Sequence, residues 1–257
     1  MREGATSMFF DEAEQDYYGW RRSWLDRERD TGALINLAYE WLTADDRVIQ
    51  PDELQALARL SWIIKFRGEI RDNTKAVVVP SFVSIFGYAF TAVTRDGLVL
   101  QLRQTDLPEK IVEAASAELG FVNFYAGFRN IGMAWMRDHH DEIVEMVRLL
   151  RESDSLDVRS EIYGAIETME PLPRPRGGDL QAYNLLTPFL ACIDRTGMCP
   201  IVNGRLELGS KFSALRLRRL GLSEIVEGVG TLVQSGALAD AFAFDTASPE
   251  TIESLVF

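Results

Sequence analysis

Histidine and cysteine are scarce in this sequence, which has two of each among its 257 residues. The two cysteines, Cys192 and Cys199, do not make the disulfide framework of a small secreted domain, so a reducing compartment is the simpler expectation. The N-terminal segment has no apolar run of signal-peptide length. The longest apolar stretch, residues 77–90, falls short of the roughly 20 residues that cross a bilayer. We therefore expect a cytoplasmic protein with no membrane partner.

The signatures of the commonest catalytic classes are also missing. The sequence has no Gly-x4-Gly-Lys phosphate loop, no Gly-x-Gly-x-x-Gly turn, no His-Glu-x-x-His, no Gly-x-Ser-x-Gly and no Cys-x-x-Cys. These absences argue against the usual nucleotide-dependent, zinc-protease and α/β-hydrolase chemistries. The sequence gives no reason to expect a cofactor and favours a role without catalysis.

The composition is that of a folded protein with a core. Hydrophobic residues make up 47% and charged residues 26% of the chain, values that are ordinary for a globular domain. The length is compatible with one large domain or two small ones. A formal net charge of −12 argues against broad binding to nucleic acid or anionic lipid and leaves room for a local basic site.

Apolar residues at helical spacing dominate the chain. Pro51 suits the first turn of a helix, Asp52 and Glu53 favour its positive end, and the apolar stripe follows from Leu54 to about residue 64. Similar patterns predict helices at about 9–27, with many aromatic residues, and at 32–42. We therefore predict a mainly α, multi-helix globular protein.

One β element interrupts this pattern near residues 76–103. The runs 77–79, 90–93 and 98–102 are rich in β-branched, aromatic or leucine side chains. Asp96-Gly97 stands between two of these runs, and Asp-Gly favours a hairpin turn because glycine adopts positive φ cheaply. We predict a small antiparallel hairpin or sheet here, although residues 81–89 fit a buried helix equally well.

A segment rich in proline, arginine and glycine, residues 171–178, is the best linker in the sequence. Its alternating prolines and its glycine pair stop a helix and favour an extended surface segment. We therefore predict a helical domain at 1–170 that carries the β insertion, and a helical C-terminal subdomain at 179–257.

Both histidines are adjacent and lie among acids, in the sequence Asp138-His139-His140-Asp141-Glu142. Imidazole and carboxylate groups could bind a metal or transfer a proton, which makes Asp138, His139, His140 and Glu142 candidate metal ligands. Adjacent helical residues point about 100° apart, however, so one ion does not readily reach both rings. The alternative is the acidic first turn of a helix, where carboxylates are favoured.

A second acidic cluster lies between two predicted helices and contains Asp45, Asp46, Asp52 and Glu53. The segment Leu42–Glu53 resembles the helix–Ala-Asp-Gly–helix turn of tellurite-resistance TerB-like domains, with Asp46 where that pattern has glycine. The resemblance implies that these acids could meet a divalent cation through oxygen ligands. Ordinary placement of acids at helix ends is the alternative.

Charge is unevenly distributed. Between residues 171 and 220 there are eight basic and three acidic residues, whereas the rest of the chain has nineteen basic and thirty-six acidic ones. Arginine forks suit phosphates and carboxylates. The candidate binding residues for nucleic acid or for a protein partner are Arg205, Lys211, Arg216, Arg218 and Arg219. The alternative is an ordinary solvated helix face.

These observations favour a non-catalytic interaction or accessory subunit of a larger intracellular assembly, which binds a protein partner. A nucleic-acid-binding module that uses the basic segment 205–219 is one alternative. A metal-dependent enzyme that uses the Asp138–Glu142 cluster is the other. Cys199 precedes Pro200 and could be a nucleophile only with a base or an electropositive niche nearby, so a packed thiol is the simpler interpretation.

Overall fold

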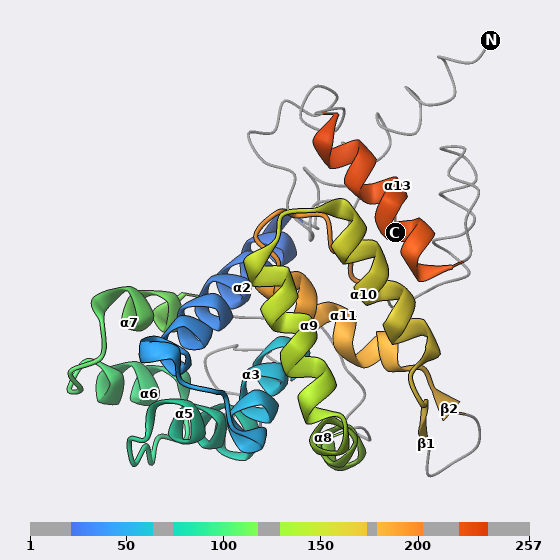
Figure 1. The fold of residues 1–257 in the computed structure, drawn as a ribbon. Coiled ribbons are helices and arrows are strands. Elements are labelled where there is room, and N and C mark those ends of the chain that lie inside the picture. Colours follow the sequence, from blue (N-terminus) through green and yellow to red (C-terminus); the bar gives the residue numbers. More distant parts are fainter. Residues whose placement is uncertain (1–21, 64–73, 118–128, 174–178, 203–220, 236–257) are drawn as a thin grey trace. The chain divides into compact units, whose positions relative to one another are not determined.

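The structure is a computed structural model that describes residues 22–63, 74–117, 129–173, 179–202 and 221–235. It is mainly helical, as predicted (Figure 1). The chain divides into two compact units: the N-terminal unit, residues 26–145, and the C-terminal unit, residues 146–257 together with residues 1–25. No helix in the described ranges is both long enough and apolar enough to cross a membrane.

The N-terminal unit is built around α3 (Pro51–Ile63), which begins at the proline that the sequence indicated. This helix packs against α5 (Val79–Phe86), against the π-helical turn η3 (Thr74–Val78) and against α8 (Arg129–Asp138). A second pair, α6 (Arg95–Leu102) and α7 (Glu109–Ser116), packs together. The apolar stripe predicted for α3 is confirmed, because Leu54, Leu57 and Leu60 are at most 1% exposed.

Helix α2 (Arg22–Leu42) is continuous through Gly32, where the sequence pattern had suggested two separate helices. Thr31 is completely buried inside α2. Leu34, Ile35 and Ala38 are buried too, and their packing outweighs the modest helix cost of one glycine. The aromatic segment that precedes residue 22 lies outside the described residues.

The hairpin predicted near residues 76–103 is wrong, because η3, α5 and α6 occupy most of this stretch. Asp96-Gly97 forms the first turn of α6, where the hydroxyl of Thr94 accepts a hydrogen bond from the Gly97 amide at 3.2 Å. This contact is an N-cap, and it gives the Asp-Gly pair a helical role. Burial explains the β-branched run, since Val77 and Val78 are at most 1% exposed. The left-handed glycine here is Gly87, which ends α5 with φ 73°.

The C-terminal unit contains part of α9 (His140–Glu152), α10 (Leu156–Thr168), α11 (Ala182–Ile193) and α13 (Leu222–Gln234). Helix α10 packs along α13 and also against α11 (Figure 1). Every residue of α11 except Asn184 is buried, which marks it as a core helix. Its Pro188 removes one helical hydrogen bond, and the neighbouring Thr187 hydroxyl accepts the Val202 amide at 2.9 Å.

Two short strands, β1 (Leu172–Pro173) and β2 (Asp179–Leu180), pair in antiparallel register, with Leu172 opposite Leu180. They bracket the proline- and arginine-rich segment, of which residues 174–178 lie outside the described ranges. Both strands belong to the C-terminal unit. The domain division predicted at residues 171–178 stays a prediction.

Helices α10 and α13 approach each other closely at a glycine, Gly230. A Cβ at Gly230 would overlap Leu156 Cδ1 and lie 3.1 Å from its Cδ2, whereas a Cβ at Gly164 would only reach Ser223 Cβ at an ordinary 3.7 Å. Such an overlap costs about 1–3 kcal/mol in a packed core, and because the half-buried Leu156 side chain can shift, we expect about 1 kcal/mol here. We expect Gly230→Ala to be less stable than Gly164→Ala by about that amount in urea unfolding. Equal stabilities would contradict the close packing, and Leu156→Ala should suppress the penalty of Gly230→Ala.

Candidate functional site

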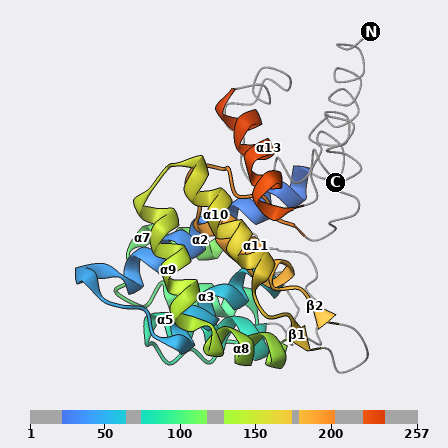
Figure 2. The same cartoon turned by 45° about the vertical axis from the view of Figure 1, so that its right-hand side comes forward.

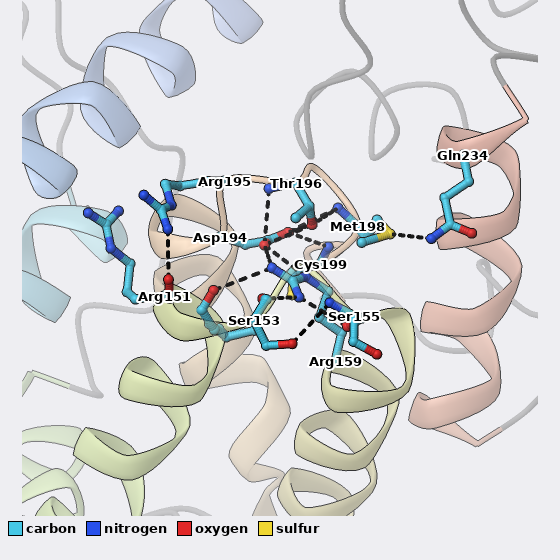
Figure 3. A network of polar contacts seen from close by, with 11 residues as sticks. Arg151, Ser153, Ser155, Arg159, Asp194, Arg195, Thr196, Met198, Cys199 and Gln234 are labelled. Carbon is cyan, nitrogen blue, oxygen red and sulfur yellow. Dashed lines mark hydrogen bonds and ion pairs between the residues drawn. The ribbon is translucent and has the colours of Figure 1, made fainter.

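In the described part of the C-terminal unit, a fully buried ion pair joins Arg159 on α10 to Asp194 at the end of α11 (Figure 3). Both side chains are 0% exposed. Arg159 Nε and Nη2 donate to Asp194 Oδ1 at 2.9 and 2.6 Å. A buried pair compensates its desolvation only when its remaining donors and acceptors are also satisfied, and the surroundings satisfy them here.

The other donors of Arg159 bind backbone carbonyls around the end of α9. Its Nη1 donates to Ser153 O at 2.7 Å and to Ser155 O at 3.0 Å. Its Nη2 also lies 3.4 Å from Leu150 O. Leu150 belongs to the last turn of α9, where carbonyls lack helical partners and a cation is favoured, whereas Ser153 and Ser155 lie in the connection to α10. Arg159 therefore joins three consecutive segments of the chain: the end of α9, α10 and the end of α11.

The carboxylate of Asp194 organises the loop that follows α11. Its Oδ2 accepts the amides of Met198 and Cys199, each at 3.0 Å, and its Oδ1 accepts the Thr196 amide at 3.2 Å (Figure 3). Gly197 takes φ 72° between these residues, a left-handed conformation that glycine adopts without strain. The loop thus wraps around one buried carboxylate.

Two ionisable groups lie against this pair. Burial raises the pKa of the Cys199 thiol well above its usual value, and the nearby carboxylate of Asp194 adds to the shift. Burial likewise raises the pKa of Tyr163, whose hydroxyl donates to Pro200 O at 2.8 Å. A thiol that keeps its proton and is closed to solvent is a poor nucleophile. The geometry therefore supports the packed-thiol interpretation of Cys199.

Removing either partner of the ion pair should strongly lower the stability of the C-terminal unit. Asp194→Ala or Arg159→Ala leaves a buried charge without compensation, which typically costs about 3–5 kcal/mol. We expect urea unfolding to show losses of that size, with the double variant costing less than the sum of the two. Glu152→Ala breaks the exposed Arg148–Glu152 pair and should cost at most about 1 kcal/mol. Equal losses in buried and exposed variants would contradict this assignment.

The raised pKa of Cys199 also predicts a pH dependence. In the unfolded chain the Cys199 thiol loses its proton at about pH 8.5, whereas in the folded protein it keeps its proton at that pH. This contribution to stability is complete below about pH 8.5 and is lost as the pH rises toward the folded pKa. The free energy of unfolding should therefore fall by up to about 1.4 kcal/mol per pH unit above that point. We expect the urea midpoint of Cys199→Ala to fall less steeply with pH than that of the unaltered protein, measured from roughly pH 7 to roughly pH 9.5. An equal pH dependence in the two proteins would contradict the prediction.

The histidine cluster is part of the helix end that the sequence suggested as the alternative. His139 Nδ1 lies 3.0 Å from Glu142 Oε2, and its ring packs on Trp135 with centroids 4.3 Å apart. His140 instead reaches back to the α2–α3 turn, with Nε2 3.1 Å from Ile49 O. Its Nδ1 lies 3.0 Å from Asp141 Oδ1, so both ring nitrogens of His140 lie against an oxygen. The two rings are engaged in separate contacts.

The acidic turn between α2 and α3 is organised by internal bonds. Glu53 pairs with Arg47 and accepts the Gln50 amide at 2.8 Å, which is the reciprocal half of a capping box. Asp45 and Asp46 both adopt φ 58°. Asp46 is thus left-handed at the position where the resembled TerB-like pattern has glycine, and aspartate is among the residues that tolerate this conformation.

Among the described residues, no three His, Cys, Asp or Glu side chains gather in a group that could hold a metal ion. This includes the candidates Asp138, His139, His140 and Glu142, which all lie in described ranges. The five basic candidates Arg205, Lys211, Arg216, Arg218 and Arg219 lie outside them. Their binding role stays a prediction.

Comparison of the chain with protein-family models, with curated proteins and with solved structures finds no match. The arrangement of its own residues is therefore the basis for any functional proposal.

Sequence reasoning missed the Arg159–Asp194 pair, although a signal was present. Arg159 shares the helical face of Ile162, Tyr163 and Ile166, which are all buried. A charged residue in an apolar stripe at i, i+3, i+4 and i+7 spacing needs a buried partner. The partner could not be chosen from the sequence, because Asp194 is 35 residues away along the chain.

Proposed function

We propose that this protein is a non-catalytic interaction or accessory subunit of a larger assembly in the cytoplasm, and that its N-terminal unit binds a protein partner. The observation that carries the proposal is the distribution of exposed apolar side chains. Among the described residues, every large apolar side chain that is exposed belongs to the N-terminal unit, namely Trp41, Val48, Val83, Val93 and Leu100. Exposed aromatic and aliphatic side chains that gather on one part of a surface are typical of interaction sites.

The engagement of the reactive groups also supports a role without catalysis. Cys199 and Tyr163 are buried beside the Arg159–Asp194 pair, and burial raises the pKa of both groups. His139 and His140 contact neighbouring residues through their ring nitrogens. Catalytic acids, bases and nucleophiles are normally reachable by a substrate. Structural contacts account for these side chains without a substrate.

A nucleic-acid-binding module is the second candidate, favoured by the charge pattern of the sequence. The segment 205–219 carries five of the eight basic residues found between residues 171 and 220. Binding through phosphates is salt-dependent, because each contact releases counterions. The variant R216A/R219A should then weaken binding to single- or double-stranded nucleic acid and reduce its salt slope. Unchanged binding would remove this segment from consideration.

Affinity purification at low salt from the cells that make the protein, with and without nuclease, separates the two candidates. A protein partner that remains at a fixed ratio after nuclease treatment is the expected result. Light scattering should then give a mass above the 29.0 kDa of one chain. Loss of all partners with nuclease would favour the nucleic-acid candidate. A monomer that retains no partner in either condition would contradict the proposed function.

A further inference from the structure

Three of the exposed apolar side chains lie at the end of α2, in the α2–α3 turn and on α5: Trp41, Val48 and Val83. We call these three side chains the Trp41 surface. Val48 is 62% exposed, Trp41 39% and Val83 36%. Covering such side chains removes apolar area from water and gains about 25 cal/mol per Å². A partner that covers the Trp41 surface would therefore gain binding free energy from apolar area that the described fold leaves exposed.

Packing places the segments that carry these side chains next to one another. The Trp41 ring meets the Phe86 ring edge-on, with centroids 6.2 Å apart, and Val83 lies one helical turn before Phe86 on α5. The Ser84 hydroxyl lies 3.4 Å from Asp52 Oδ2, which places the first turn of α3 beside α5. Figures 1 and 2 both show the α2–α3 connection running next to α5. The apolar side chains thus share one region of the N-terminal unit.

The turn that carries Val48 is held in a fixed conformation. Arg47 Nη1 donates to Leu42 O at 3.0 Å, and the same guanidinium pairs with Glu53. His140 Nε2 holds the turn from the other side through Ile49 O at 3.1 Å. A surface that is already ordered loses little entropy when a partner binds, which favours affinity.

Charge identifies the kind of partner. Asp45, Asp46 and Asp52 are exposed in the same turn. The one basic residue between positions 43 and 52 is Arg47, and its charge is paired with Glu53. The α2–α3 turn beside Trp41 and Val48 therefore carries a net negative charge. Such a charge repels phosphates and anionic lipids and attracts cationic groups.

We propose that the Trp41 surface docks a basic segment of another protein. Apolar side chains of that segment cover Trp41, Val48 and Val83, and its lysine or arginine side chains lie against Asp45, Asp46 and Asp52. This inference rests on the proposed function, because it names the surface and the partner chemistry for the same interaction. A buried aromatic anchor with charged groups at the rim is the usual energetic layout of such interfaces.

Site-specific photo-crosslinking in the cells that make the protein tests this surface. The variants Val48→p-benzoylphenylalanine and Val83→p-benzoylphenylalanine carry the crosslinker on the Trp41 surface. The variant Leu100→p-benzoylphenylalanine is the matched control, because Leu100 is 60% exposed in the same unit. We expect one protein adduct from positions 48 and 83 and none from position 100. Mass spectrometry should find the crosslink in a segment that carries lysine or arginine among apolar residues.

A synthetic peptide of the crosslinked segment then measures the two contributions separately. Trp41→Ala should weaken its binding at least about tenfold, the loss expected from an interface anchor. D45N/D46N removes two charges while asparagine still tolerates the left-handed backbone. This variant should weaken binding and flatten its salt dependence. Binding that is unaffected by both variants would overturn the inference.

The outcomes distinguish this inference from the proposed function. An adduct with an acidic or neutral segment, with a second copy of this chain, or only at position 100 overturns the Trp41 surface and leaves the proposed function standing. The same holds if a partner co-purifies while no position gives an adduct. Absence of both a co-purifying partner and any adduct overturns both.

Discussion

The buried pair of Arg159 and Asp194 is the constraint on which the C-terminal unit depends. Each group satisfies the other's charge, and each then binds a different part of the backbone: Arg159 the carbonyls at the end of α9, Asp194 the amides of the loop after α11. Because an isolated charge is very costly inside a protein, the segments that supply these partners must come together for either residue to be buried. One interaction therefore fixes a loop and three helices relative to one another.

The same constraint bears on function. The Asp194 carboxylate, the Cys199 thiol and the Tyr163 phenol lie near one another in the C-terminal unit, and all three are closed to solvent. In the described part of the N-terminal unit, by contrast, several large apolar side chains are exposed, Trp41 among them. The proposed partner-binding role rests on these exposed apolar side chains and on the closure of the C-terminal ionisable groups to solvent.

The fold could be predicted from the sequence where several local signals agreed. Pro51, the acids after it and the apolar stripe agreed, and α3 begins at that proline. Prediction failed at Asp96-Gly97, where the hairpin signal was local and the Thr94 cap and the burial of neighbouring segments favoured a helix. The candidate site was harder, because its partners are distant in sequence. The position of Arg159 in an apolar stripe indicates that it is buried, but no local sequence feature identifies Asp194 as its partner. The contact between His140 and Ile49 has no local sequence signal either.

Native-state hydrogen exchange at the amides of Met198 and Cys199 tests the central claim most directly. Within the described part of the chain, both amides donate to the buried carboxylate of Asp194, and that of Met198 also donates to the Thr196 hydroxyl. If the pair organises the unit, both amides should exchange only when the C-terminal unit unfolds, as slowly as the core amides of α11. Exchange at the rate of an exposed loop, unchanged in Asp194→Asn, would contradict the account.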